Sequence, residues 1–158
     1  MSRTVHRPRT GDLIHLNKIR RVRRSDLAQV IEIDARITRL RKPAYWAGIQ
    51  RRYGGRDPQR FFLVAEAQGK VEGYVVGEVR DWEFGSPACG WVFGIGVRPE
   101  ARLGGTGTRL LEAICASFRK RGVTKVRTLL SRDNGLVLAF FRSQGLMAAP
   151  FIALERDL

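Results

Sequence analysis

A short apolar run, a glycine-rich stretch and an amphipathic segment follow one another within residues 91–121, and this succession restricts the fold more than any other feature. The run WVFGIGV (91–97) is apolar at nearly every position, which predicts a strand covered on both faces. The segment 106–121 places its apolar residues on one helical face, and VTKVRTLL (123–130) has the composition of a further strand. A strand, a helix and a second strand in this order predict a right-handed βαβ unit, and therefore a parallel strand pair.

Further strands and helices are predicted on both sides of this unit. The predicted strands cover 19–24, 60–67 and 71–79, the helices cover 25–37, 43–52 and 134–144, and residues 146–158 are expected to form a final strand or hairpin arm. Ser25 or Asp26 is expected to cap the first helix. The order β-α-α-β-β-β-α-β-α-β predicts an α/β fold with a mixed central sheet, the strand 91–97 near its centre and helices on both faces.

The bulk properties are those of one domain. A chain of 158 residues with 44% hydrophobic residues suits a single core, which we place at 19–158 behind a flexible basic segment at 1–18. No apolar run reaches the roughly 20 residues of a membrane span, and no signal-peptide pattern is found, so a soluble protein with a cytoplasmic location is expected. Cys89 and Cys115 have neither a CxxC spacing nor neighbouring histidines, so reduced thiols and no metal site are expected.

The net charge of +14 is concentrated early in the chain, where residues 1–60 contain 16 Lys and Arg against 5 Asp and Glu. This charge indicates either a solvated basic face or attraction to a polyanionic cofactor, an acidic protein or a nucleic acid. No helix carries basic residues along one face, which disfavours nucleic-acid binding. The sequence is compatible with a homodimer and does not decide the oligomeric state.

The glycines of RLGGTG (102–107) stand between the strand and the helix of the βαβ unit. Glycine at such a place lets an anion approach the free backbone N–H groups of a helix N-terminus. A P-loop would need lysine directly after its last glycine, but Thr108 follows here. A dinucleotide fingerprint beginning at Gly94 fails at Pro99. Neither standard nucleotide motif fits.

With Val97 and Pro99 before it, RLGGTG takes the form V-x-P-x-x-R-x-x-G-x-G, which resembles the acetyl-CoA-binding signature of the GNAT superfamily of N-acetyltransferases. The segment 134–146 resembles a second motif of that superfamily, with Asn134 before the helix, Phe140 and Phe141 at the aromatic positions and a glycine and a leucine at its end. The order of elements over 19–158 is also similar. The resemblance implies a GNAT fold, in which two neighbouring strands of the central sheet, here 91–97 and 123–130, splay apart around the thioester.

The resemblance also implies roles for individual residues, with acetyl-CoA as the cosubstrate. Arg102 would shape the loop or contact a phosphate, and Asn134 would contact the cofactor near the gap, in the catalytic centre. The backbone N–H of Val97 would stabilise the tetrahedral oxyanion. The amides that would bind the pyrophosphate are those of Leu103, Gly104, Gly105, Thr106, Gly107 and Thr108, and the backbone groups that would pair with the pantetheine arm, as if it were an added strand, are those of Ile95, Gly96 and Val97.

The catalytic groups depart from the superfamily pattern. Its members commonly place a tyrosine at the position of Phe141 to protonate the leaving thiolate, but Phe141 has no hydroxyl and is expected to pack against the cofactor's arm or in the core. The preferred general base is Glu78, which shares a strand face with Tyr74. Glu32, Asp34 or a water chain are the alternatives.

These features predict direct, sequential transfer of an acetyl group from acetyl-CoA to a primary amine, without an acyl-enzyme. Basic residues of the expected acceptor groove, among them Arg36, Arg39 and Arg41, favour a protein lysine or N-terminal amine in an acidic setting, or else an anionic small-molecule amine. A catalytically weak, CoA-binding regulatory module is the alternative that Phe141 supports.

Overall fold

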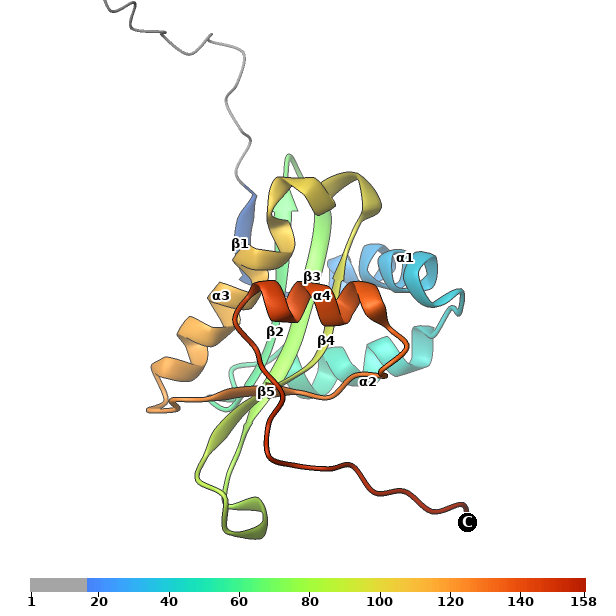
Figure 1. Ribbon diagram of the computed structural model, residues 1–158. Coiled ribbons are helices and arrows are strands. Elements are labelled where there is room, and N and C mark those ends of the chain that lie inside the picture. Colours follow the sequence, from blue (N-terminus) through green and yellow to red (C-terminus); the bar gives the residue numbers. More distant parts are fainter. Residues whose placement is uncertain (1–16) are drawn as a thin grey trace, which may run out of the picture.

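The computed structural model describes residues 17–158. Their strands form one five-stranded sheet in the order β1-β2-β3-β4-β5 (Figure 1). The strands are β1 (Lys18–Arg21), β2 (Arg60–Ala67), β3 (Lys70–Arg80), β4 (Cys89–Val97) and β5 (Val126–Thr128). Successive strands from β1 to β4 pair antiparallel, whereas β5 is parallel to β4. The predicted mixed sheet and its parallel pair are therefore confirmed, and β4 is an inner strand between β3 and β5.

Helices cover both faces of the sheet. Four α-helices and three short 3-10 helices are found among the described residues: α1 (Leu27–Thr38), α2 (Pro43–Tyr53), α3 (Thr106–Arg119), α4 (Gly135–Ser143), η1 (Arg24–Asp26), η2 (Glu83–Gly85) and η3 (Pro99–Gly104). Phe61 and Leu63 of β2 belong to a core with α3, whereas Phe62 and Val64 belong to a second core with α1 and α2. The period of two along β2 thus divides its side chains between the two layers.

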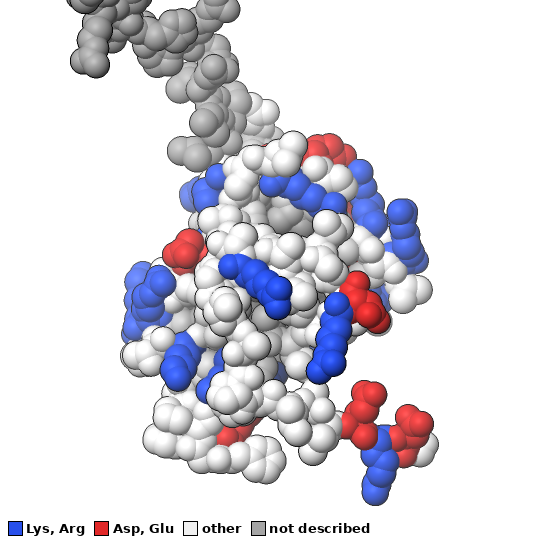
Figure 2. Space-filling view, viewed as in Figure 1, with Lys and Arg blue, Asp and Glu red and all other residues white. Residues whose placement is uncertain are grey.

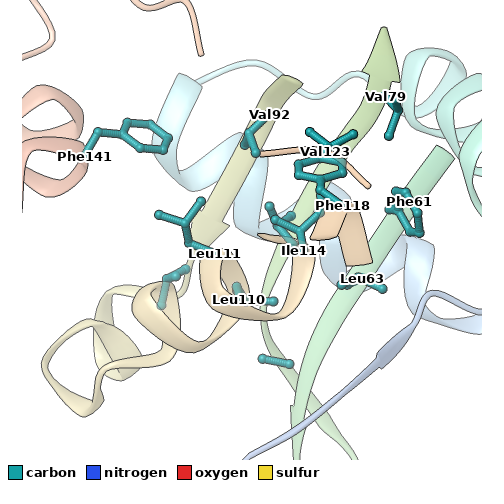
Figure 3. Close-up of a cluster of buried hydrophobic side chains, with 13 residues drawn as sticks. Phe61, Leu63, Val79, Val92, Leu110, Leu111, Ile114, Phe118, Val123 and Phe141 are labelled. Atoms are coloured by element: carbon teal, nitrogen blue, oxygen red, sulfur yellow. The ribbon is translucent and has the colours of Figure 1, made fainter. Parts of the chain in front are cut away.

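The core beneath α3 brings the start of that helix to the end of β4. Ile114 and Phe118 of α3 point at the sheet beside Phe61 and Val92 (Figure 3). A Cβ on Gly90 would lie only 2.3 Å from the ring of Phe118, so the glycine lets the helix approach the strand closely. At the other end of the pair, a Cβ on Gly107 would lie 3.6 Å from Val97, so the start of α3 lies beside the end of β4.

The two parallel strands separate after one short stretch of pairing. β5 pairs with β4 only from Gly90 to Val92. Phe93 is an extra residue in β4, because Val76 pairs with Gly94 while its neighbour on β3 already pairs with Val92. A bulge bends a strand and increases its twist. Beyond it, the edge of β4 that turns away from β3 has no strand partner among residues 17–158, as the expected splay requires.

Two local predictions fail. Residues 146–158 form no strand and instead lead away from the sheet (Figure 1), with Ile152 84% and Leu154 86% exposed. A strand needs a partner edge, and this segment pairs with no strand among the described residues. Asp26 does not cap α1 with its side chain, because its carboxylate binds the guanidinium of Arg20 and accepts from the N–H of Arg23, 2.6 Å away.

Part of the expected N-terminal segment, residues 1–16, lies outside the described residues. Asn17 is buried and Lys18 begins β1, so the last two residues of that segment belong to the folded domain. Cys89 is buried, Cys115 is partly buried, and both are free thiols whose pKa values burial raises.

Candidate functional site

The glycine-rich stretch ends in a helix N-terminus that is open to an anion. Gly105 has a φ of 73°, in the left-handed region that glycine adopts without strain, and it turns the chain from η3 into α3. The first bond of α3 runs from the N–H of Arg109 to the carbonyl of Gly105, at 3.1 Å. The N–H groups of the first turn therefore have no acceptor within the helix and point beyond its end, where the helix dipole favours negative charge.

The other two glycines of the stretch have different roles. A Cβ on Gly104 would meet no atom of residues 17–158 within 4 Å, so this position faces open space. A Cβ on Gly107 would lie 3.2 Å from the ring of Phe140, so Gly107 lets α4 pack against α3. Of the three, Gly104 is the one that leaves the approach to the backbone free.

Four polar residues hold this stretch from behind. The side-chain amide of Asn17 donates to Glu72 at 2.7 Å and to the hydroxyl of Thr106, which is only 1% exposed, at 2.8 Å. Arg109 donates to Asn17 at 3.0 Å and to the carbonyl of Gly104 at 2.8 Å. Sequence analysis missed this network because the residues lie far apart in the chain and form no motif.

One exposed arginine, Arg102, lies in the last turn of η3, just before the open end of α3. Arg102 and Thr108 are exposed, and the guanidinium of Arg102 makes no hydrogen bond or ion pair with residues 17–158. Lys and Arg side chains are spread over the face drawn in Figure 2, with fewer Asp and Glu among them. Arg102 is therefore available to an incoming anion.

A cavity of about 290 Å³ fills the gap between β4 and β5. One half is formed by the diverging strands and α4, and the other half by α1, α2 and β3. The lining residues are Asp34, Ile37, Thr38, Lys42, Tyr45, Trp46, Tyr74, Val92, Phe93, Gly94, Ile95, Thr128, Leu129, Leu130, Asn134, Val137 and Phe141.

The strand half of the cavity offers backbone groups. The N–H of Arg98 donates to Glu72 across the β3–β4 ladder at 2.8 Å. Alternate residues of an antiparallel strand direct their N–H groups to opposite sides, so those of Val97 and Ile95 point away from β3 and into the gap. Gly96, between them, is bonded toward β3. The free edge of β4 can therefore accept an extended chain as an added strand.

Two residues of the second motif lie at the same gap. Asn134 is the N-cap of α4, and its side chain accepts from the N–H of Val137 at 3.3 Å. Phe141 is 4% exposed, and its ring lies edge-on to Phe140 with the ring centroids 5.3 Å apart. Phe141 belongs to the core under α3 and also forms one wall of the cavity.

The helical half of the cavity contains a buried carboxylate. Asp34 accepts from the indole N–H of Trp46 at 2.8 Å, and the ammonium of Lys42 lies 3.0 Å from the same carboxylate oxygen. The ring of Tyr45 lies edge-on to Trp46, with the centroids 5.2 Å apart. A carboxylate beside aromatic rings is an arrangement that binds a cation.

Tyr74 of β3 presents a hydroxyl to the cavity. Its side chain packs edge-on against Trp46 at 4.8 Å and lies over Gly96, where a Cβ would come within 2.6 Å of the ring. Tyr74 is 4% exposed, and its hydroxyl makes no hydrogen bond to any residue in 17–158. Burial, together with the charges of Asp34 and Tyr45, raises the pKa of Tyr74, so the hydroxyl remains a donor. No motif marks this residue.

Glu78 and Glu32 do not line the cavity. The carboxylate of Glu78 accepts from the hydroxyl of Tyr53 at 2.8 Å and from the guanidinium of Arg80 at 2.9 Å. Glu32 pairs with the buried Arg98 at 3.0 Å. Of the three carboxylates considered from the sequence, only Asp34 reaches the gap.

Neither a metal centre nor a membrane anchor is evident in the described part of the chain. Within it, no three His, Cys, Asp or Glu side chains gather as a metal site would require. No helix of residues 17–158 combines the length and the hydropathy that a membrane span requires.

Comparisons with known proteins agree with this geometry. The chain is 34% identical to mycothiol acetyltransferase of Saccharomonospora viridis over 105 residues, which are 65% of this chain and 33% of that protein. It is 35% identical to L-2,4-diaminobutyric acid acetyltransferase of Nocardia farcinica over 79 residues, which are 50% of this chain and 39% of that protein. The matches thus span little more than a third of these curated relatives.

Solved structures share the fold. An aminoglycoside N-acetyltransferase, AAC(6')-Iy, solved in complex with CoA, superimposes with a TM-score of 0.77 at 17% identity, over 89% of this chain and 94% of that one. The sequence profile of the acetyltransferase (GNAT) family matches residues 27–146. The chain therefore belongs to the GNAT family of acetyltransferases.

Proposed function

We propose that this protein transfers an acetyl group from acetyl-CoA directly to a primary amine. The observation that carries the proposal is that one continuous cavity joins the gap between β4 and β5 to the buried carboxylate of Asp34. A donor and an acceptor that enter from the two halves would meet at the bulge of β4. Family membership supports the reaction class.

The donor half would hold acetyl-CoA by its phosphates and its arm. The backbone amides from Leu103 to Thr108 would bind the pyrophosphate at the start of α3, with Arg102 beside it. The free edge of β4 would pair with the pantetheine arm, since Ile95 and Val97 direct their N–H groups into the gap. The N–H of Val97, which the sequence predicts for the oxyanion, lies toward the phosphate end of the arm and does not line the cavity, so the N–H of Ile95 would face the thioester oxygen as it gains charge.

In the acceptor half, Asp34 would bind the ammonium of the incoming amine and take its proton. An amine of lysine type has a pKa near ~10.4 and must lose a proton before it can attack. We propose Asp34 for this role in preference to Glu78, because Glu78 is bonded to Tyr53 and Arg80 outside the cavity.

Tyr74 would supply the hydroxyl that Phe141 lacks. Its unpartnered O–H opens on the cavity and stays protonated, so it would donate a hydrogen bond to the reacting thioester as the bond to sulfur breaks. Its raised pKa makes it a hydrogen-bond donor rather than a source of free protons. The thiolate of CoA, with a pKa near ~8.5 by analogy with cysteine, leaves without full protonation.

The acceptor would carry a carboxylate near its amine. Asp34 suits an ammonium, while the exposed Arg39 and Arg41 of the loop between α1 and α2 suit an anion. A protein lysine or N-terminal amine in an acidic setting and an anionic small-molecule amine both have this chemistry. The similarity to L-2,4-diaminobutyric acid acetyltransferase supports the small amino acid.

A panel of amines, followed as release of free CoA thiol, tests this proposal. L-2,4-diaminobutyrate, free lysine and a lysine flanked by glutamates should be acetylated faster than spermidine or an aminoglycoside. A strong preference for the polycations would refute the acceptor assignment.

The second candidate is a CoA-binding regulatory module with weak catalysis, which the absence of a hydroxyl on Phe141 supports. The two readings differ in one measurement. Saturable binding of acetyl-CoA without thiol release for any amine would favour the module, whereas turnover well above the rate without enzyme would favour the enzyme.

A further inference from the structure

The cavity already contains a primary amine, that of Lys42. Its ammonium lies 3.0 Å from one oxygen of Asp34 and 3.3 Å from the other, and 5.5 Å from the centre of the Tyr45 ring. Lys42 lines the same cavity as the strand gap. This is the position that an acceptor's ammonium would occupy.

The main chain holds Lys42 at this place. It is the N-cap residue of α2, followed directly by Pro43, and its carbonyl accepts from the N–H of Trp46 at 3.1 Å. Its side chain is 35% exposed, so it retains access to water and freedom to turn. The other lysines of the chain are exposed and do not line the cavity: Lys18, Lys70, Lys120 and Lys125.

We propose that Lys42 is acetylated by the acetyl-CoA that its own molecule binds. The inference rests on the proposed acetyl transfer and names an acceptor inside the chain. The Lys42 ammonium gives one proton to Asp34, its nitrogen forms a bond to the thioester carbon, and the carbon–sulfur bond breaks. CoA leaves as the thiolate, and the second proton lost by nitrogen passes to it or to water.

The reaction changes the charge of the acceptor half. An N-acetyl-lysine is neutral, so Asp34 loses its cationic partner while Trp46 still donates to it. The acetylated side chain also occupies part of the cavity, and external amines must compete with Lys42 before it reacts. Because Lys42 and the bound acetyl-CoA belong to one complex, the reaction is first order in protein, so with acetyl-CoA in excess its half-time does not depend on protein concentration.

The test is incubation of the full chain with acetyl-CoA at a series of protein concentrations, followed by intact mass and peptide mapping. We expect one acetyl group per chain, on Lys42, with the same half-time at every protein concentration. Lys42→Arg keeps a cation beside Asp34 and should gain no acetyl group. Gly104→Glu, which places a carboxylate at the phosphate site, should abolish the modification of Lys42.

Several results would overturn the inference. Equal labelling of the exposed lysines, or labelling of Lys42 that persists in Gly104→Glu, would indicate chemical acetylation. A rate that rises with protein concentration would indicate transfer between molecules. Turnover of an external amine without any label on Lys42 would overturn this inference alone. If a protein that binds acetyl-CoA showed no turnover and no label, the proposed function would be overturned as well.

Discussion

Tyr74→Phe removes one oxygen atom from the cavity and should move activity and stability in opposite directions. The side chain is buried and its hydroxyl has no partner among residues 17–158, although the hydroxyl oxygen itself is not enclosed; a fully buried polar group left unpaired costs about 1–3 kcal/mol. Because this hydroxyl opens on the cavity, where water can reach it, we expect only part of that cost to be recovered. The free energy of unfolding should rise by about 0.5–1 kcal/mol, which raises Tm by a few degrees.

The same change should lower kcat. Loss of one preorganised hydrogen-bond donor to a developing negative charge typically slows acyl transfer by about 100-fold or more. Affinity for acetyl-CoA should stay the same, since Tyr74 lies away from the start of α3. Thiol release in the steady state gives kcat, urea unfolding gives stability, and calorimetry gives the affinity.

Tyr53→Phe is the matched control. Tyr53 is also buried, but its hydroxyl donates to Glu78 at 2.8 Å outside the cavity. Its loss should cost about 1 kcal/mol of stability and leave kcat unchanged, because Glu78 keeps its bond to Arg80. A fully active Tyr74→Phe together with an inactive Tyr53→Phe would refute the assignment and move the chemistry to Glu78.

Three further predictions concern the donor site, the acceptor site and the fold. Gly104→Glu should weaken acetyl-CoA binding by at least about 100-fold with little loss of stability, because the new side chain enters open space; unchanged affinity by calorimetry would disprove the phosphate site. Asp34→Asn should lower kcat/KM for the amine by about 100-fold, while the bond from Trp46 is kept; equal kcat/KM in both proteins would exclude Asp34 as the base. Arg98→Ala should destabilise the fold by about 2 kcal/mol in urea unfolding, because the carbonyl of Val71 loses its 2.6 Å bond; a change below about 0.5 kcal/mol would contradict this.

Local signals in the sequence predict the elements around the donor site well. The apolar run of β4, the stripe of α3 and the branched residues of β5 each act over a few neighbouring residues, so their periodicity is visible in the chain. The glycine-rich stretch belongs to this class too. Each of its three glycines, however, is required for a different structural reason, and only the open approach at Gly104 concerns the ligand.

Signals that depend on distant partners are not visible in this way. Residues 146–158 have strand-like composition but pair with no strand among the described residues, and β-structure requires such an edge. The sequence favours Glu78 as the base, because Glu78 shares a strand face with Tyr74. Along that face of β3, however, Glu78 contacts Tyr53 and Arg80 near one end of the strand, whereas Tyr74, farther along, lines the cavity.

The sequence by itself determined the order of strands and helices up to α4 and the loop at the start of α3, because each follows from contacts between near neighbours. It also determined the parallel pair, because a strand, a helix and a strand in succession restrict the connection. Only the tertiary structure decided what faces the gap. Asp34 from α1, Lys42 from the loop after it and Tyr74 from β3 meet there because β4 bulges at Phe93 and parts from β5. That meeting depends on how two layers pack on a bent strand, which no spacing within the chain encodes.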